Sequence, residues 1–328
     1  MKALIFGISG QDGAYLARLL LTKGYEVHGT SRDAEMSPFA SLSALGIRDR
    51  VCLHSVAVTD FRSTYQAISS ICPSEIYNLS GQSSVGLSYQ QPVETLESIA
   101  TGTLNILEAI RLMGGDIRFY NAGSSECFGD TKGQAADEST PFHPKSPYAV
   151  AKSAAFWEVA SYRDSYGIYA CSGILFNHES ILRPARFVTR KIAMAAACIA
   201  AGSNETLRLG DLTVRRDWGL ASEYVEPMWM MLQQESPEDF VIATGHLSGL
   251  EDFVACAFAA LELDWRRYVE SDSALLRPSE IRSGFGRPDK AKRLLGWEAR
   301  THMPDIAALM ARAELARIKG ETMTEFLC

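Results

Sequence analysis

An α/β fold, built on a doubly wound parallel sheet of the Rossmann type, is predicted for this chain of 328 residues by three observations. An apolar run at residues 2–6 leads into a glycine-rich turn, and residues 14–22 continue with helical periodicity. Further short apolar runs alternate with longer amphipathic segments, which is typical of strand–helix units. Small polar residues follow several of these runs, at the strand ends where open parallel sheets bind ligands.

The first strand and helix are joined by the turn GISGQDG. Gly7 permits the tight turn, Gly10 lets the backbone approach a pyrophosphate, and Gly13 lets the helix pack close to the strand. The phosphates would lie on the helix N-terminus. Because the three glycines stand between a strand and a helix, they predict a dinucleotide-binding site.

The rest of the sheet is expected from five further apolar runs, at residues 24–30, 51–53, 75–79, 117–120 and 170–176. A long amphipathic helix is expected within residues 92–113, and its core face should carry Leu104, Ile106, Leu107 and Ile110.

The choice between NADP and NAD is predicted by the residues after the second strand. An arginine there accommodates the 2′-phosphate of NADP, whereas a carboxylate hydrogen-bonds the ribose of NAD. Arg32 and Asp33 are adjacent, so both signals are present. We favour NADP because Arg32 comes first and Ser31 could add a hydrogen bond, but NAD is not excluded. The alternative is a solvated loop whose charges pair with each other.

Catalytic chemistry is predicted for Tyr148 and Lys152. The two lie four residues apart among good helix formers, so their side chains share one helical face. A lysine in that position can lower the pKa of the phenol and reach a ribose hydroxyl. A Tyr-x-x-x-Lys pair also occurs by chance. The polar cluster at residues 122–126, which follows a predicted strand, adds support here.

The second half of the chain carries basic groups that suit a second diphosphate. Each of them alone is more often a salt-bridged surface group. No flexible linker separates the halves, so we expect a smaller, interwoven C-terminal α/β domain for substrate at residues 176–328, after a dinucleotide domain at 1–175 to which residues 211–226 return. The basic groups are Arg183, Arg186, Arg190, Lys191, Arg215, Arg216 and Arg277, the last close to Glu280.

Composition excludes several classes of protein. A formal charge of −7, without a basic run, argues against a nucleic-acid partner. The longest apolar stretch, residues 192–201, is too short to span a membrane. The seven cysteines are scattered without C-x-x-C spacing, so neither a disulfide framework nor a metal site is expected. The same cysteine pattern fits a reducing cytosol, so we expect a cytoplasmic location. The chain begins directly with a strand, so no signal sequence is expected.

Several motifs resemble the extended short-chain dehydrogenase/reductases and, within them, the GDP-mannose 4,6-dehydratase family. The resemblance covers nearly the whole chain. GQDG, NHES and RRDWG are specific to this branch. The other matching segments are YNLSGQSSVGLSYQQPV, SSE, SPYAVAK, FVTRKI, LRLG, YVEPMWMMLQQ, LLRPSEI and KAKRLLGW.

The resemblance implies a redox cycle without net redox. Bound NADP would take hydride from C4 of the sugar of GDP-mannose, a base would remove the C5 proton, water would leave from C6, and the hydride would return to C6. Tyr148 would act on the 4-hydroxyl with help from Lys152. Ser124, where the family usually has threonine, would bind the 4-oxygen, and Glu126 would take the C5 proton. Its alternative role is a helix-capping or salt-bridge carboxylate.

The resemblance also implies binding residues and a homo-oligomer, either a dimer or a tetramer. The cofactor would be held by Gly7, Gly10, Gln11, Asp12, Gly13, Arg32, Ser80, Tyr148 and Lys152. The nucleotide sugar would be held by Ser83, Asn177, Arg183, Lys191, Arg216, Arg277 and Glu280.

Besides Ser124, the chain departs from the family pattern at four places. The loop SRDAEMSPFA replaces an Arg-Arg-x-Ser-Ser type loop, Ala57 replaces an aspartate, and Asp211 replaces an asparagine. HES-Ile-Leu-Arg-Pro replaces HES-Pro-Arg-Arg-Gly and leaves Arg183 alone. These departures concern cofactor choice, the tetramer, and the nucleobase or sugar that is accepted.

Two other functions stay open. The first is a 4-reductase or epimerase for a related GDP-sugar, and a reductase would consume NADPH. The second is an inactive NADP-binding regulatory protein, which only the altered cofactor loop favours. The presence of Ser124, Glu126, Tyr148 and Lys152 argues against it.

Overall fold

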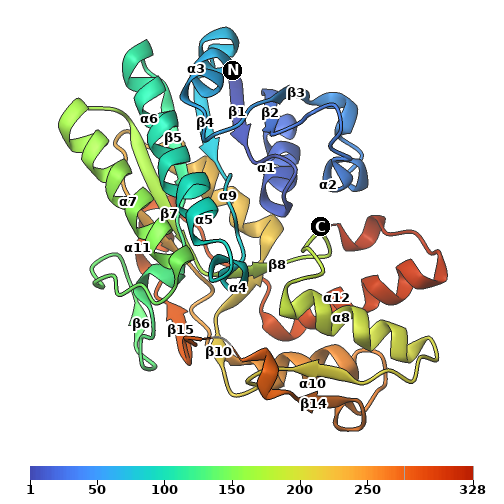
Figure 1. Cartoon of the computed structure of the whole chain (residues 1–328). Helices are drawn as coiled ribbons and strands as arrows, with labels where there is room; N and C mark the ends of the chain where they lie inside the picture. Colours follow the sequence, from blue (N-terminus) through green and yellow to red (C-terminus); the bar gives the residue numbers. More distant parts are fainter. Residues whose placement is uncertain (277, 328) are drawn as a thin grey trace.

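The computed structural model describes residues 1–276 and 278–327. Its centre is a seven-stranded parallel sheet in the order β12-β7-β5-β4-β1-β2-β3 (Figure 1). The strand order reverses beside β1, which places the turn after β1 at the switch point where such sheets bind ligands. The strands are β1 (Lys2–Phe6), β2 (Glu26–Ser31), β3 (Cys52–Ser55), β4 (Glu75–Asn78), β5 (Arg118–Ala122), β7 (Ala170–Leu175) and β12 (Phe240–Ile242).

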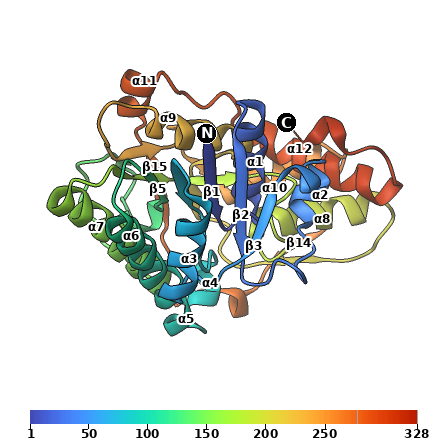
Figure 2. The same cartoon turned by 90° about the horizontal axis from the view of Figure 1, so that it is seen from above.

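Helices cover both faces of this sheet (Figure 2). In β1, Ala3 and Ile5 belong to one core and Leu4 and Phe6 to the other, because successive side chains of a strand point to opposite faces. All four are fully buried, as expected for a parallel strand covered on both sides. The first core includes α1 (Gln11–Thr22), α2 (Ala40–Ala44), α9 (Ala221–Leu232) and α11 (Asp289–Leu295), and the second α3 (Phe61–Ile71), α6 (Gly102–Met113) and α7 (Pro147–Tyr166).

A smaller lobe is built around a third core between α8 (Val188–Ala200), α10 (Leu250–Ala259) and α12 (Met303–Lys319). Outside the large sheet, the remaining strands form three small sheets. One contains β13 (Ser248–Gly249), β10 (Arg215–Arg216), β15 (Ser283–Gly286) and β6 (Ala135–Ala136). In the other two, β8 (Asn177–Glu179) pairs with β11 (Trp218–Leu220), and β9 (Leu207–Leu209) pairs with β14 (Val269–Ser271).

The chain passes repeatedly between the two lobes. Strand β6 comes from the first half of the sequence but pairs with β15, whereas β12 comes from the second half and pairs with β7 in the large sheet. Helix α9 likewise packs on the first core. The predicted fold, a doubly wound α/β sheet, is confirmed. No helix in the described part of the chain is long and apolar enough to cross a membrane.

The predicted core face of the long helix was wrong at one position. Leu104 is 38% exposed, and the buried stripe carries Thr103, Ile106, Leu107 and Ile110 instead. The Thr103 hydroxyl tolerates burial because it donates to the Ile99 carbonyl oxygen at 2.7 Å and accepts a hydrogen bond from Asn78. A core face predicted from apolar residues alone leaves out buried polar residues such as Thr103. The helix itself consists of α5 (Pro92–Leu96), a π-helical turn at Glu97–Thr101, and α6.

Candidate active site

The glycine turn has the shape that a dinucleotide requires. Gly7 adopts φ +85°, and a Cβ there would lie 2.6 Å from the Leu79 carbonyl oxygen. A Cβ on Gly13 would lie 2.5 Å from the Gly7 carbonyl oxygen, so the helix packs close to the turn. At Gly10 a Cβ would meet only the Gly7 oxygen, at 3.4 Å. Among the described residues, no side chain caps α1, whose first N–H groups therefore suit the phosphates of a cofactor.

The side chains of Gln11 and Asp12 bind other parts of the protein. Gln11 Nε2 donates to the His178 carbonyl oxygen at 3.2 Å and to Asp12 Oδ1 at 2.9 Å, and Gln11 Oε1 accepts from Ser180 Oγ at 2.8 Å. Asp12 Oδ2 lies 2.9 Å from His178 Nε2. The GQDG and NHES motifs thus interlock, and the predicted cofactor contact of Asp12 stays a prediction for its backbone.

Sequence reasoning assigned no role to His178 or Ser180. Burial alone would raise the pKa of Asp12, but the charge and hydrogen bond of His178 lower it to about 2. Burial would lower the pKa of His178, and Asp12 outweighs burial so that it is raised. The sequence pattern did not predict this pair, because α1 and β8 are far apart in the sequence.

The loop that was expected to choose the cofactor separates its two charges. Asp33 Oδ1 accepts hydrogen bonds from the backbone N–H groups of Glu35 and Met36, both at 3.0 Å. Arg32 is exposed at the carboxyl end of β2. Ser80, beyond β4, donates from its hydroxyl to Asn78 Oδ1 at 2.6 Å. The alternative in which Arg32 and Asp33 pair with each other finds no such ion pair among the described residues.

Helix α7 carries the predicted catalytic pair into the interior. It begins after Ser146, whose hydroxyl accepts the Ala149 N–H, and Pro147 occupies its first turn. Tyr148 is 9% exposed and Lys152 8% exposed. Lys152 Nζ donates to the Ala122 carbonyl oxygen at 2.8 Å, so the helix is tied to the end of β5.

The expected lowering of the Tyr148 pKa by Lys152 is not what this structure shows. Burial raises the pKa of Tyr148 above its usual range, and a hydrogen bond with Ser124 opposes this only in part. Burial also lowers the pKa of Lys152, to about 8. The lysine ammonium lies 5.9 Å from the centre of the phenol ring and is directed at Ala122, and burial dominates both groups.

Ser124 and Glu126 stand directly after β5, on the side of Tyr148. The Glu126 N–H donates to Ser124 Oγ at 3.3 Å, which begins a short helical turn. Glu126 is half-buried, and its negative charge adds to the rise in the pKa of Tyr148. The structure therefore brings a hydroxyl, a carboxylate and a phenol together. Cys127 between them is buried, and burial raises the pKa of its thiol to about 11, so it behaves as a small apolar residue.

Arg183 lies near enough to this cluster for its charge to act on Tyr148. Its Nε lies 3.1 Å from Glu179 Oε2, and its guanidinium stacks 3.7 Å from the centre of the Phe187 ring. Its positive charge lowers the pKa of both Tyr148 and Asp12, so it acts on both of these predicted site residues.

The neighbouring cations are placed differently. Arg190 forms an ion pair with Glu314, which is 1% exposed in the core of the smaller lobe. Its charge is structural. Lys191 is exposed and donates to the Arg208 carbonyl oxygen at 2.7 Å.

Arg216 and Glu280, both expected to contact the substrate, form an ion pair of 2.9 Å. Arg216 is 8% exposed, which requires such a partner. Asn177 begins β8, and Ser83 is exposed beyond β4. The prediction for Arg277 lies outside the described residues.

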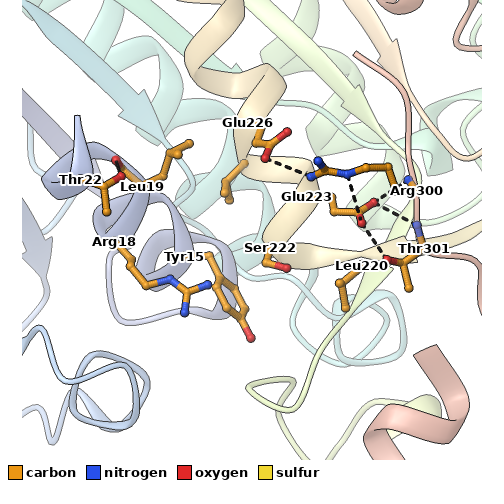
Figure 3. Close-up of a pocket in the computed structure, with 11 residues that line it drawn as sticks. Tyr15, Arg18, Leu19, Thr22, Leu220, Ser222, Glu223, Glu226, Arg300 and Thr301 are labelled. Atoms are coloured by element: carbon orange, nitrogen blue, oxygen red, sulfur yellow. Dashed lines mark hydrogen bonds and ion pairs between the residues drawn. The ribbon is translucent and has the colours of Figure 1, made fainter. Parts of the chain in front are cut away.

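A separate pocket of about 370 Å³ contains none of the predicted site residues. It lies between α1, α9 and the segment before α12 (Figure 3). Glu223 accepts hydrogen bonds from the Thr301 hydroxyl at 2.7 Å and the Arg300 N–H at 2.8 Å, and Arg300 also reaches Glu226. These polar groups satisfy one another, so we assign the pocket to the helix junction.

Proteins of known family match this chain over nearly its whole length. The sequence pattern of the family described as GDP-mannose 4,6 dehydratase matches residues 4–310. GDP-mannose 4,6 dehydratase 2 of Arabidopsis thaliana is 44% identical over 97% of this chain and 88% of its own length. GDP-mannose 4,6-dehydratase of Sinorhizobium fredii is 42% identical over 97% of each chain.

Solved structures share the fold. DesIV, a dTDP-glucose 4,6-dehydratase of Streptomyces venezuelae solved with NAD, superposes with a TM-score of 0.84 at 20% identity over 97% of each chain. RMD of Pseudomonas aeruginosa, solved with NADPH, gives 0.79 at 20% identity over 96% of this chain and 99% of that one. On the strength of the sequence matches, this chain belongs to the GDP-mannose 4,6-dehydratase family.

Proposed function

We propose that this protein is a nucleotide-sugar 4,6-dehydratase that converts GDP-mannose to GDP-4-keto-6-deoxymannose. The observation that carries the proposal is the convergence of Ser124 and Glu126 on Tyr148 in a member of this family. A reductase would need the hydroxyl, the phenol and the lysine, but no carboxylate beside them. Glu126 therefore favours dehydration over reduction.

The residues divide the chemistry between them. A bound nicotinamide dinucleotide supplies the hydride acceptor and returns the same hydride. Tyr148 takes the proton of the sugar 4-hydroxyl, and Ser124 hydrogen-bonds the same oxygen. Lys152 would contact a ribose hydroxyl of the cofactor. Glu126 removes the C5 proton and protonates the C6 hydroxyl, which leaves as water. The proton that Tyr148 takes balances the proton that C5 regains, so the product differs from the substrate by one water.

We propose NADP as the cofactor, held by the glycine turn, Ser80 and Arg32. The Asp33 carboxylate is used by its own loop, which leaves Arg32 to meet a 2′-phosphate. Related structures contain either NAD or NADPH, so the alternative NAD is tested directly. Arg32→Ala should weaken NADPH binding by roughly tenfold or more, because it removes a charge-assisted contact. NADH binding should change little, and an equal loss for both would favour NAD.

We propose that the GDP-sugar lies against Arg183, Arg216 and Glu280, with Asn177, Lys191 and Ser83 at the margins of the same cleft and Arg277 as a further contact. The ion pair with Glu280 holds the buried guanidinium of Arg216 in a fixed position. Such a group suits bidentate binding of a phosphate.

We propose that the protein forms a homo-oligomer through α5 and α7. Val93 and Trp157 are 68% and 62% exposed on these packed helices, and Leu96 and Val150 are also exposed. A second copy would remove this apolar area from water. Sedimentation should show a dimer or tetramer, and Trp157→Lys should dissociate it. A cytoplasmic location is proposed with it, because the cysteines of the described residues are free thiols.

One experiment separates the candidate functions. Purified protein is incubated with GDP-mannose and catalytic NADP, without reductant, and the sugar product is followed by mass spectrometry. A loss of one water without net change in NADPH supports the dehydratase. Stoichiometric consumption of NADPH with a GDP-4-keto-6-deoxy sugar would favour the reductase, and dinucleotide binding without turnover of either substrate would favour the inactive regulatory protein.

Two variants test the assigned roles. Tyr148→Phe and Glu126→Gln should each lower turnover by roughly 10²–10⁴-fold, whereas Asp130→Asn, a control carboxylate on the adjoining loop, should retain it. Full dehydration by Glu126→Gln would refute the role given to Glu126.

A further inference from the structure

His178 is a buried histidine that contacts the start of α1, directly after the glycine turn. His178 is 8% exposed, and its ring stacks on Tyr224 of α9 with centroids 4.8 Å apart. Nε2 lies 2.9 Å from Asp12 Oδ2, and Nδ1 lies 2.7 Å from the Phe176 carbonyl oxygen. Neither a backbone carbonyl nor an ionised carboxylate can donate a hydrogen bond. Both ring nitrogens must therefore donate, which only the imidazolium form can do.

Three elements surround this imidazolium. Asp12 approaches from α1, Arg183 from the segment after β8, and Tyr224 from α9. The carboxylate favours the charged ring and the guanidinium opposes it, and the effect of the carboxylate on the pKa of His178 is the larger of the two. The remaining oxygen of Asp12 accepts from Gln11.

The positive charge of His178 offsets the negative charge of Asp12 at the start of α1. Asp12 is the second residue of α1, the helix whose N-terminus faces the proposed pyrophosphate. An uncompensated carboxylate there would repel that anion. We propose that His178 is a positioning residue held as an imidazolium, and that its charge balances Asp12 so that the glycine turn accepts a dinucleotide pyrophosphate. The proposal rests on the proposed use of a nicotinamide dinucleotide.

The first test needs no cofactor. Nitrogen NMR of ¹⁵N-histidine-labelled, ligand-free protein reports the protonation of each ring, and His178→Gln assigns the signals. His178 should be doubly protonated at pH 7 and titrate above the ordinary histidine value of about 6.5. Asp12→Asn should move this titration to lower pH. A neutral His178 ring at pH 7 would overturn the proposal.

The second test measures NADPH binding by nicotinamide fluorescence between pH 6 and 9. Wild-type affinity should fall as His178 loses its proton. His178→Gln, which can still donate one hydrogen bond to Asp12, should bind roughly tenfold or more weakly at pH 6 and lose this part of the pH dependence. Adding Asp12→Asn to it should restore much of the affinity, because the uncompensated carboxylate is then gone.

His28→Gln is the matched control. His28 also places Nε2 2.9 Å from a carboxylate, that of Glu26, but lies outside the glycine turn. It should leave the NADPH profile unchanged. A merely structural His178 would give a His178→Gln variant that is weaker by the same factor at every pH and is not rescued by Asp12→Asn. Failure of wild-type protein to bind NADPH or NADH at any pH would instead refute the cofactor proposal.

Discussion

Replacing Lys152 by methionine should stabilise the ligand-free protein while removing its activity. Lys152 is buried, and burial lowers its pKa from 10.5 to about 8. The difference of about 2.5 units corresponds to about 3 kcal/mol of folding free energy spent on keeping the amine charged at pH 7. Its hydrogen bond to the Ala122 oxygen returns about 1–2 kcal/mol. Lys152→Met should therefore raise the free energy of unfolding by about 1–2 kcal/mol, which corresponds to about 2 °C in melting temperature.

The pH dependence of the stability difference tests whether burial of the charged amine causes it. Between about pH 8 and 10.5 the unfolded chain binds more protons at Lys152 than the folded chain, so wild-type stability rises with pH across this window. The variant lacks the group, and its advantage should shrink as pH rises. Urea denaturation from pH 6.5 to 9.5 measures this. Lys191→Met, which removes an exposed lysine that also donates to a carbonyl oxygen, should show no such gain. A Lys152→Met advantage that is absent at pH 7, or constant with pH, would refute the reasoning.

Three further predictions concern the scaffold. Glu75→Ala should cost about 2–4 kcal/mol in urea denaturation, because the buried carboxylate accepts hydrogen bonds from two tyrosine hydroxyls; a loss below 1 kcal/mol would contradict it. Gly7→Ala should reduce NADPH affinity roughly tenfold or more, since its Cβ would strike the Leu79 oxygen in a left-handed conformation; unchanged fluorescence titrations would refute this. Leu104→Ala should change stability by less than about 0.5 kcal/mol and Leu107→Ala should cost about 2–5 kcal/mol; equal losses would show that exposure misjudges Leu104.

The local parts of the site were accessible from sequence. The glycine turn and the Tyr148–Lys152 helix face are set by residues within one turn of each other, and spacing alone predicts their geometry. The doubly wound α/β class followed from the alternation of strands and helices. The pKa of Tyr148 was not predictable, because burial depends on how α7 packs against the rest of the chain.

The long-range partners of charged residues were the main omission. Arg190 and Arg183 looked alike in a basic cluster, yet Arg190 pairs with buried Glu314 while Arg183 reaches the catalytic cluster. His178 has no local signal, since its carboxylate partner lies in α1. A sequence can show that a charge is present. Its partner depends on tertiary packing.

The branch-specific motifs have a common physical reason in this structure. GQDG meets NHES through Gln11 and His178, which links the cofactor turn to the segment that carries Arg183. In RRDWG, Asp217 is fully buried and accepts hydrogen bonds from Thr244, just beyond β12 of the large sheet, and from Gly245. Each motif therefore supplies one half of a contact whose other half is distant in sequence. These contacts hold segments together that are far apart in the sequence.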